Sequence, residues 1–152
     1  MSNQNTKRIH RNTDSIMHYK LFGMLWNSLP RFRTTICDLS ENTGRNIIKM
    51  VYASEDGIVM GGAVGGRLRD DTTYLNFLFV PPQYRMGFGR VGANLLGAFE
   101  KECLTKYIEA ESYENRTIDW MGKMGYFFEN GVDVQRELKN DRMVLLTKDV
   151  FE

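Results

Sequence analysis

One stretch of the sequence combines residue types that could bind a phosphate group. A strand-like segment leads into the glycine-bearing loop Pro81–Gly89, which opens directly onto a helical pattern. Glycines let backbone N–H groups approach a ligand closely, and the first four N–H groups of a helix have no partner within it. The helix N-terminus also carries about +0.5 of an elementary charge. With Arg85 and Arg90 beside it, this stretch predicts a pyrophosphate site, and the alternative is a tight turn without a ligand.

The same glycines fit a second pattern, the G-x-G-x-x-G of dinucleotide-binding folds. Gly87, Gly89 and Gly92 match it, and Glu109 follows about 20 residues later. In those folds the strand leads almost directly into the first glycine, and strands alternate with helices. Here six residues, two of them prolines, separate Val80 from Gly87, and the preceding segments read as a strand meander. NAD or FAD binding is therefore the less favoured hypothesis.

Acidic residues gather near the end of a later predicted strand, Tyr107–Tyr113. Period-two alternation places Glu109 and Glu111 on one face of this strand, and Glu114 and Asp119 follow it. An amine with a pKa near ~10.4 is mostly protonated at neutral pH, and a carboxylate can accept that proton. The acids could also attract a cationic ligand, or form an ordinary solvated rim.

The elements that must position these residues form an α/β pattern. Asn12–Ser15 supplies N-cap chemistry for a helix that Pro30 ends. Alternation and turn residues predict strands over Thr34–Leu39, Asn46–Ser54, Gly57–Leu68, Thr72–Val80, Tyr107–Tyr113 and Met143–Lys148. Helices are predicted over Gly89–Thr105 and Thr117–Met124, and strand plus turn over Tyr126–Asn140.

Two features predict how these elements pack. Asp56-Gly57 is the pair typical of a tight hairpin, so the early strands form an antiparallel meander. Thr72–Val80 is apolar on both faces, which predicts helices on both sides of the sheet. The following helix carries an apolar stripe with a four-residue spacing, formed by Val91, Leu95, Phe99 and Cys103.

Length and composition favour one domain over residues 1–152. The 152 residues are 42% hydrophobic with a net charge of +1, which argues against a basic nucleic-acid arm or a polybasic membrane anchor. Residues 1–8 are expected to be disordered, with a short strand near Lys7–His10 as the alternative. The sequence has no apolar run of the ~20 residues that a membrane helix needs and no secretory signal pattern, so we expect a cytoplasmic protein. Two lone cysteines and two lone histidines predict no metal site.

The two candidate regions together resemble a known family. Val80-Pro-Pro-Gln-Tyr-Arg-Met-Gly-Phe-Gly-Arg90 is similar to the acetyl-CoA pyrophosphate loop, Gln/Arg-x-x-Gly-x-Gly/Ala, of the GCN5-related N-acetyltransferase (GNAT) superfamily. The segment from Glu111 to Tyr126 resembles the second signature of the family, an acidic strand end followed by a helix reading Phe-Tyr-x-Lys-x-Gly-Phe/Tyr. Gly61-Gly62 and Gly65-Gly66 are similar to the hairpin before the loop. The resemblance covers roughly residues 45–148.

This resemblance implies a GNAT fold: an α/β domain whose mixed, mostly antiparallel sheet has helices on both faces. It implies an N-acetyltransferase that uses acetyl-CoA as cosubstrate, with direct attack of a primary amine on the thioester and no metal. Two strands would separate near Leu78–Val80 to receive the pantetheine arm. The implied cofactor-binding residues are Leu78, Phe79, Val80, Arg85, Met86, Gly87, Phe88, Gly89, Arg90 and Asn115, with Glu114 as the alternative to Asn115. The implied catalytic residues are Glu111, Tyr113 and Asn76, with water-relayed proton removal as the alternative.

The sequence departs from the family pattern at two positions. Tyr84 aligns with the Gln/Arg of the loop unless the loop is one residue shorter, which would place Arg85 there. Met121 replaces the tyrosine that often protonates the departing thiolate, and a thioether cannot donate a proton. The second departure motivates an alternative function, a non-catalytic acyl-CoA-binding or regulatory module.

The resemblance does not specify one acceptor or one oligomeric state for the protein. The acceptor amine could belong to a small molecule or to a protein, and Ser15–Leu29 with Phe127–Asn140 would shape its pocket. A homodimer is compatible with the family, in which late strands are often exchanged. Neither nucleic acid nor a membrane is expected as a partner.

Overall fold

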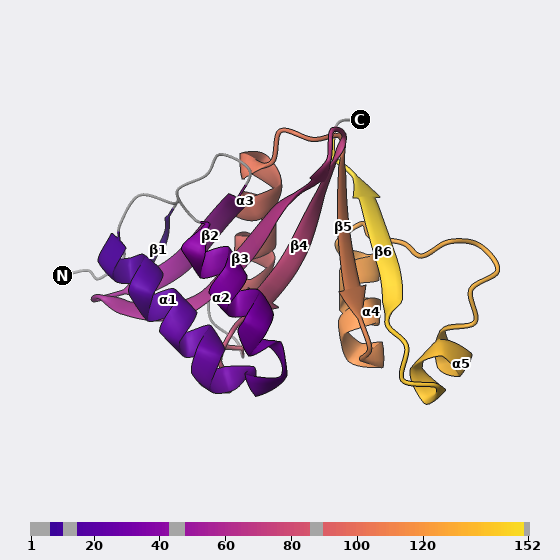
Figure 1. Cartoon of the computed structure of the whole chain (residues 1–152), viewed down its shortest axis with the longest axis horizontal. Coiled ribbons are helices and arrows are strands. Elements are labelled where there is room, and N and C mark those ends of the chain that lie inside the picture. Colours follow the sequence, from indigo (N-terminus) through magenta and orange to yellow (C-terminus); the bar gives the residue numbers. More distant parts are fainter. Residues whose placement is uncertain (1–6, 11–14, 43–47, 86–89, 151–152) are drawn as a thin grey trace. The chain divides into compact units, whose positions relative to one another are not determined.

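The computed structural model describes residues 7–10, 15–42, 48–85 and 90–150, and these contain one mixed sheet (Figure 1). Its strand order is the sequence order, β1 to β6. The strands are β1 (Lys7–His10), β2 (Ile48–Glu55), β3 (Ile58–Arg69), β4 (Thr72–Phe79), β5 (Tyr107–Ser112) and β6 (Val144–Asp149). The helices are α1 (Ser15–Ser28), α2 (Arg33–Glu41), α3 (Val91–Glu102), α4 (Asn115–Lys123) and α5 (Val134–Lys139), with 3-10 turns η1 (Pro30–Phe32) and η2 (Pro82–Tyr84).

The chain folds into two compact units that are interleaved along the sequence. Unit 1 comprises Met1–Gly66 and Phe77–Cys103, and unit 2 comprises Arg67–Asn76 and Leu104–Glu152. Strands β3 and β4 therefore each contribute residues to both units.

Unit 1 is organised by the predicted hairpin. Asp56 (φ 52°) and Gly57 (φ 79°) both adopt positive φ, as a two-residue turn between twisted strands requires. Strands β2 and β3 pair antiparallel from Ile48↔Gly66 onward, with a register shift after Ala53. Strand β1 pairs antiparallel with β2, which confirms the short strand at Lys7–His10. The expectation of disorder through residue 8 is wrong for residues 7 and 8, because this pairing orders their backbone.

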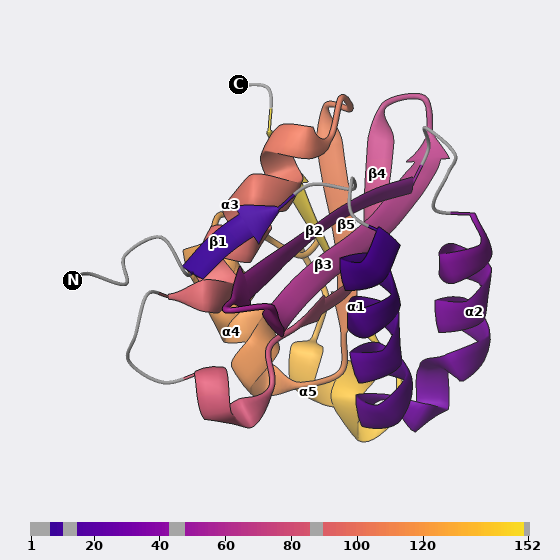
Figure 2. The ribbon, with the colours of Figure 1, turned by 90° about the vertical axis from the view of Figure 1, so that its left-hand side faces the viewer.

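Helices cover both faces of the sheet in unit 1, as predicted (Figure 2). A Cβ atom built on Gly62 would lie 2.4 Å from Cδ1 of Leu21 in α1. A Cβ atom on the preceding Gly61 would lie 3.1 Å from Cδ1 of Leu95 in α3. Since successive strand residues face opposite sides, α1 and α3 pack against opposite faces. The absence of a Cβ at these two glycines makes room for Leu21 of α1 and Leu95 of α3.

The predicted strand Thr34–Leu39 is wrong, because this segment lies in helix α2. Its β-branched residues favour a strand locally. However, Ile36 and Leu39 have helical spacing and are 2% and 7% exposed, and they join the core with Leu21 and Leu25 of α1. Burial of this apolar pair outweighs the small differences in intrinsic propensity.

The apolar stripe of α3 is confirmed. Its four members are all buried: Val91, Leu95, Phe99 and Cys103.

Unit 2 contains a parallel strand pair and an antiparallel pair. Strand β4 pairs parallel with β5 at Thr72↔Tyr107 through Tyr74↔Glu109, and β5 pairs antiparallel with β6. Within this unit the parallel pairing ends at Tyr74, earlier than the predicted separation near Leu78–Val80. Helix α4 packs on β5 and β6.

The segment Tyr126–Asn140 is only partly as predicted. Phe127 forms a single antiparallel bridge with Thr147, which agrees with a short extended piece. Helix α5 was expected to be a turn. Its N-cap Asp133 accepts a hydrogen bond from the Arg136 N–H at 3.2 Å, and none of its residues is buried. Without a buried face, the helix leaves no apolar periodicity in the sequence.

Candidate functional site

The N-terminus of α3 in unit 1 is the first candidate feature. Arg90 is the N-cap residue, with a left-handed backbone (φ 46°, ψ 53°) and no side-chain capping bond. The first helical bond runs from the Asn94 N–H to the Arg90 carbonyl at 3.0 Å. The N–H groups of Val91, Gly92 and Ala93 therefore precede the hydrogen-bond ladder of the helix. The predicted loop residues Met86, Gly87, Phe88 and Gly89 lie outside the described residues.

Arg85 is held against the end of β4. Its Nε donates to the Val80 carbonyl at 2.6 Å, and its guanidinium carbon lies 5.7 Å from the ring centroid of Phe79. Val80 is buried, whereas Leu78 and Phe79 are half-buried. A guanidinium has five N–H donors, so the Nε bond leaves the terminal nitrogens for an anion. Arg85 thus braces this turn and remains compatible with its predicted contact to phosphate.

The residues at this helix end fit an anionic group. The first-turn N–H groups and the helix dipole both favour negative charge, and the exposed Arg90 adds a cation. A non-glycine residue with left-handed backbone is uncommon and costs about 1–2 kcal/mol. Such local strain is often found at binding sites.

A hydrogen bond between Tyr74 and Glu111 is the second candidate feature, and it lies in unit 2. The Tyr74 hydroxyl donates to Oε1 of Glu111 at 2.7 Å. Burial, this hydrogen bond and the charges of Glu111 and Glu109 raise the pKa of Tyr74 well above its usual value. Tyr74 is therefore a neutral donor under ordinary conditions. The sequence prediction named Glu111 but not Tyr74. Their meeting depends on the β4–β5 register, which no local pattern reveals.

Glu109 has a different partner from Glu111. Its Oε2 lies 2.6 Å from an Arg69 guanidinium nitrogen, and the Glu109 side chain is only 13% exposed. The two glutamates share one face of β5, as predicted, since Ile108 and Ala110 between and beside them are buried. The dinucleotide hypothesis would use Glu109 to bind a ribose hydroxyl. Its close ion pair with Arg69 weakens that hypothesis.

The remaining predicted site residues in unit 2 lie on β4, just after β5 and at the start of α4. Asn76 is half-buried and follows Tyr74 on the same face of β4. Tyr113 lies just after β5 and is 39% exposed. Asn115 begins α4 and exchanges amide hydrogen bonds with Gln135, at 2.9 and 3.4 Å. A ligand that used the Asn115 amide would compete with Gln135.

Met121 lies in the core, where it is 2% exposed. Its backbone carbonyl accepts a hydrogen bond from the Tyr126 N–H at 3.0 Å. At this position of α4 the chain therefore offers a packed thioether and no acidic hydroxyl.

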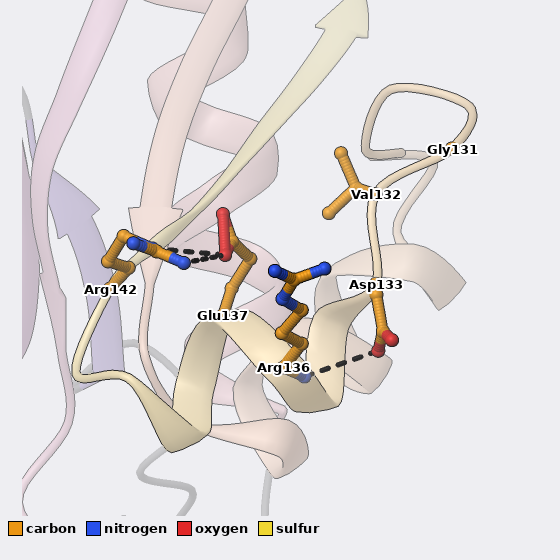
Figure 3. Close-up of a pocket in the computed structure, with 6 residues that line it drawn as sticks. All are labelled: Gly131, Val132, Asp133, Arg136, Glu137 and Arg142. Atoms are coloured by element: carbon orange, nitrogen blue, oxygen red, sulfur yellow. Dashed lines mark hydrogen bonds and ion pairs between the residues drawn. The ribbon is translucent and has the colours of Figure 1, made fainter.

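A pocket of about 350 Å³ opens in unit 2 beside α5 (Figure 3). Glu137 and Arg142 form an ion pair across it at 3.0 Å. Figure 3 shows the Arg136 side chain extending between Glu137 and Val132. The pocket is lined by Gly131, Val132, Asp133, Arg136, Glu137 and Arg142. Most of these residues lie in the segment Phe127–Asn140, which the sequence associates with acceptor binding.

The described part of the chain contains neither a cluster of metal-ligating side chains nor a membrane-spanning helix. No three His, Cys, Asp or Glu side chains there come together as a metal site would require. None of the helices in those ranges has the length and apolarity to cross a membrane.

Comparison with known proteins identifies the fold. No family model matches the sequence, and no curated protein matches it in sequence. Solved structures match over nearly the whole chain. One from Desulfovibrio desulfuricans, described as an acetyltransferase of the GNAT family, has a TM-score of 0.74 at 16% identity and covers 95% of this chain and 99% of its own. An acetyltransferase from Streptococcus agalactiae has a TM-score of 0.71 at 18% identity, covering 95% and 99%.

A third similar structure contains coenzyme A. It is the PaiA N-acetyltransferase from Thermoplasma acidophilum in complex with coenzyme A, with a TM-score of 0.67 at 14% identity, covering 98% of this chain and 99% of its own. The chain has the fold of the GNAT acetyltransferases, which confirms the fold that the sequence motifs predicted.

Proposed function

We propose that this protein is an N-acetyltransferase that transfers the acetyl group of acetyl-CoA to a primary amine. The similarity of fold over 95% of the chain to a structure described as a GNAT acetyltransferase carries the proposal. Because one fold can host several functions, the proposal also depends on what the residues of each unit can do.

Unit 1 provides the features suited to the cofactor. Acetyl-CoA would supply an acetyl group activated as a thioester. The N–H groups of Val91, Gly92 and Ala93 and the side chain of Arg90 would hold its pyrophosphate. The assignments of Met86, Gly87, Phe88 and Gly89 to the same group, and of Leu78–Val80 to the pantetheine arm, follow from the sequence resemblance.

Unit 2 provides the features suited to proton removal. An ammonium group must lose a proton before its nitrogen can form the new N–C bond. Glu111 can accept this proton, because it is exposed and the Tyr74 hydroxyl that donates to it is neutral. Glu109 is less suited, because Arg69 already neutralises it. Met121 offers no proton to a departing thiolate, so the proposal assigns no side-chain acid to that step.

The acceptor is proposed only as a class, an amine that is cationic at neutral pH. It could belong to a small molecule or to a protein. The exposed carboxylate of Glu111 favours a positively charged acceptor. The pocket beside α5 carries two arginines and two acidic residues, so its formal charges balance. It therefore gives no reason to prefer an anionic acceptor.

Binding of acetyl-CoA tests the first half of the proposal. Isothermal titration should compare wild type with Gly92→Glu and with Gly97→Glu. Gly92 lies in the first turn of α3, where a carboxylate suits the helix dipole but repels a pyrophosphate. Gly97 lies later in α3, and a Cβ there meets no atom within 4 Å. We expect micromolar binding that falls at least about 10-fold in Gly92→Glu alone, since about 1.4 kcal/mol of repulsion suffices.

Turnover tests the second half of the proposal. Thiol release from acetyl-CoA should be followed with a panel of small amines and lysine peptides. Release that depends on an amine supports the transferase. Tight binding without turnover on any amine supports the alternative, a non-catalytic acyl-CoA-binding module. No binding in wild type contradicts both.

A further inference from the structure

Two glutamates on one face of β5 have unequal partners. Glu109 and Glu111 are two residues apart, so their Cα atoms are separated by about 7 Å. Glu109 is largely buried and lies 2.6 Å from the Arg69 guanidinium. Glu111 is exposed and accepts one hydrogen bond, at 2.7 Å, from the Tyr74 hydroxyl.

These partners leave the two carboxylates differently available to an incoming ammonium group. A guanidinium is permanently charged, so Glu109 is already engaged in a charge-assisted hydrogen bond with Arg69. A tyrosine hydroxyl is neutral and adds no such charge. It donates to Oε1 of Glu111, and a carboxylate has a second oxygen, Oε2, that can accept an N–H from a ligand.

Tyr74 is suited to fix the orientation of Glu111. The Tyr74 side chain is half-buried on β4, and residue 74 is the Cα partner of Glu109 in the parallel register. A side chain packed in a sheet has few alternative rotamers, whereas an exposed glutamate has several. The raised pKa of Tyr74, caused first by burial and then by Glu111, keeps the hydroxyl protonated and therefore always a donor.

We propose that Tyr74 is a positioning residue that holds the Glu111 carboxylate in place to accept the proton of the acceptor amine, while Arg69 keeps Glu109 from that role. The proposal rests on the proposed acetyl transfer and adds to it the group that receives the proton. In this step the N–H bond of the ammonium breaks and an O–H bond forms on Glu111. The nitrogen keeps the electron pair that then forms the N–C bond to the acetyl carbonyl carbon. The C–S bond breaks and coenzyme A leaves as a thiolate, while the second N–H proton, lost as the amide forms, passes to solvent or to that thiolate.

The test is a double-mutant cycle on turnover. With the amine that gives the highest rate, kcat and KM are measured for Tyr74→Phe, Glu111→Gln and the double variant. Tyr107→Phe is the matched control, because it removes a hydroxyl from another tyrosine of the β4–β5 pair, one whose ring centroid lies 5.1 Å from Lys106 Nζ and which has no proposed role in the reaction. We expect kcat to fall by about 100-fold or more in Glu111→Gln and about 10-fold in Tyr74→Phe, with KM for acetyl-CoA unchanged. The double variant should be no slower than Glu111→Gln alone.

A rescue experiment tests the role of Arg69. In the Glu111→Gln background, Arg69→Met removes the cation that neutralises Glu109. We expect this second change to restore part of the lost kcat and to move the pH profile of kcat, because a different carboxylate then accepts the proton. Failure to restore any rate would contradict the assignment of Arg69.

Other outcomes would overturn the role of Tyr74. If Tyr74→Phe slows Glu111→Gln by the same factor as it slows wild type, Tyr74 acts independently of Glu111 and the proposal is wrong. If Tyr74→Phe does not fold, Glu111→Asp provides the test instead: its shorter side chain withdraws from Tyr74 and should lose rate with KM unchanged. A wild type that binds acetyl-CoA but acetylates no amine would instead refute the transfer reaction itself.

Discussion

The contact between Gly62 of β3 and Leu21 of α1 allows a quantitative prediction for Gly62→Ala. The added Cβ would lie 2.4 Å from Cδ1 and 2.9 Å from Cδ2 of Leu21, and 3.1 Å from the Val51 carbonyl oxygen. Nonbonded carbon atoms prefer about 3.5–4.0 Å, so Leu21 must retreat by about 1 Å. Leu21 is completely buried, so its retreat disturbs a close-packed core.

The cost of this overpacking should be about 2 kcal/mol, within the usual range of roughly 1–3 kcal/mol. For a protein of this size, that corresponds to a Tm lower by about 4–8 °C. The measurement is urea and thermal unfolding of wild type, Gly62→Ala and Gly97→Ala. Gly97→Ala is the matched control because its Cβ meets no atom within 4 Å. It should be neutral or stabilising by up to about 1 kcal/mol, since alanine favours a helix over glycine.

A second substitution separates overpacking from backbone effects. Leu21→Ala alone should cost about 2–5 kcal/mol by opening a cavity. Combined with Gly62→Ala, it should cost at least about 1 kcal/mol less than the sum, because the space vacated by Leu21 accepts the new methyl group. The reasoning would be refuted if the loss of stability in the double variant equalled the sum of the two single losses to within about 0.5 kcal/mol. It would also be refuted if Gly62→Ala and Gly97→Ala were equally stable.

Three further perturbations have defined outcomes. Above pH ~10 the unfolded chain loses the Tyr74 proton, whereas the folded protein keeps it because the pKa of Tyr74 is raised. The free energy of unfolding should therefore fall as the pH rises, by up to about 1.4 kcal/mol per pH unit. The gap in unfolding free energy between wild type and Tyr74→Phe should therefore narrow from pH 9.5 to 11.5, and a constant gap would contradict this. Arg90→Gly should relieve the strain of the left-handed backbone and raise the free energy of unfolding by about 1 kcal/mol. It should also weaken acetyl-CoA binding because it removes a cation, and this loss of affinity should be larger at low salt than at high salt. Calorimetry at two salt concentrations measures both effects. Asp133→Ala removes the N-cap of α5, which should destabilise this helix by about 1 kcal/mol and speed amide hydrogen exchange in its residues. Acetyl-CoA binding should not change.

Much of the fold could be predicted because local signals and tertiary packing agree over most of the chain. The Asp56-Gly57 hairpin and the stripe of α3 are examples, and both are confirmed. The prediction failed at α2, where β-branched residues indicated a strand but the burial of Ile36 and Leu39 stabilises a helix. It also failed at α5, which buries no residue and depends on its Asp133 cap.

The candidate site also contains one feature that the sequence predicted and one that it did not. The N-terminus of α3 could be predicted because its glycines and arginines are contiguous in the sequence. The identity of the residue beside Glu111 could not, because Tyr74 is 37 positions away and reaches it only through a parallel register. Parallel strands are joined by a long crossover connection, and the residues of that connection do not reveal which side chains of the two strands will meet.

The interleaving of the two units governs the order in which the chain can complete them during synthesis. The last segment of unit 1 ends at Cys103, and the second segment of unit 2 begins at Leu104 and runs to Glu152. At about 5–20 residues per second, a ribosome needs roughly 2–10 s to make that last stretch. During this time unit 1 is fully synthesised, while Arg67–Asn76 waits for the rest of unit 2. A break between Cys103 and the exposed Leu104 would leave all of unit 1 on one fragment, so this junction is the natural place to divide the protein for fragment complementation.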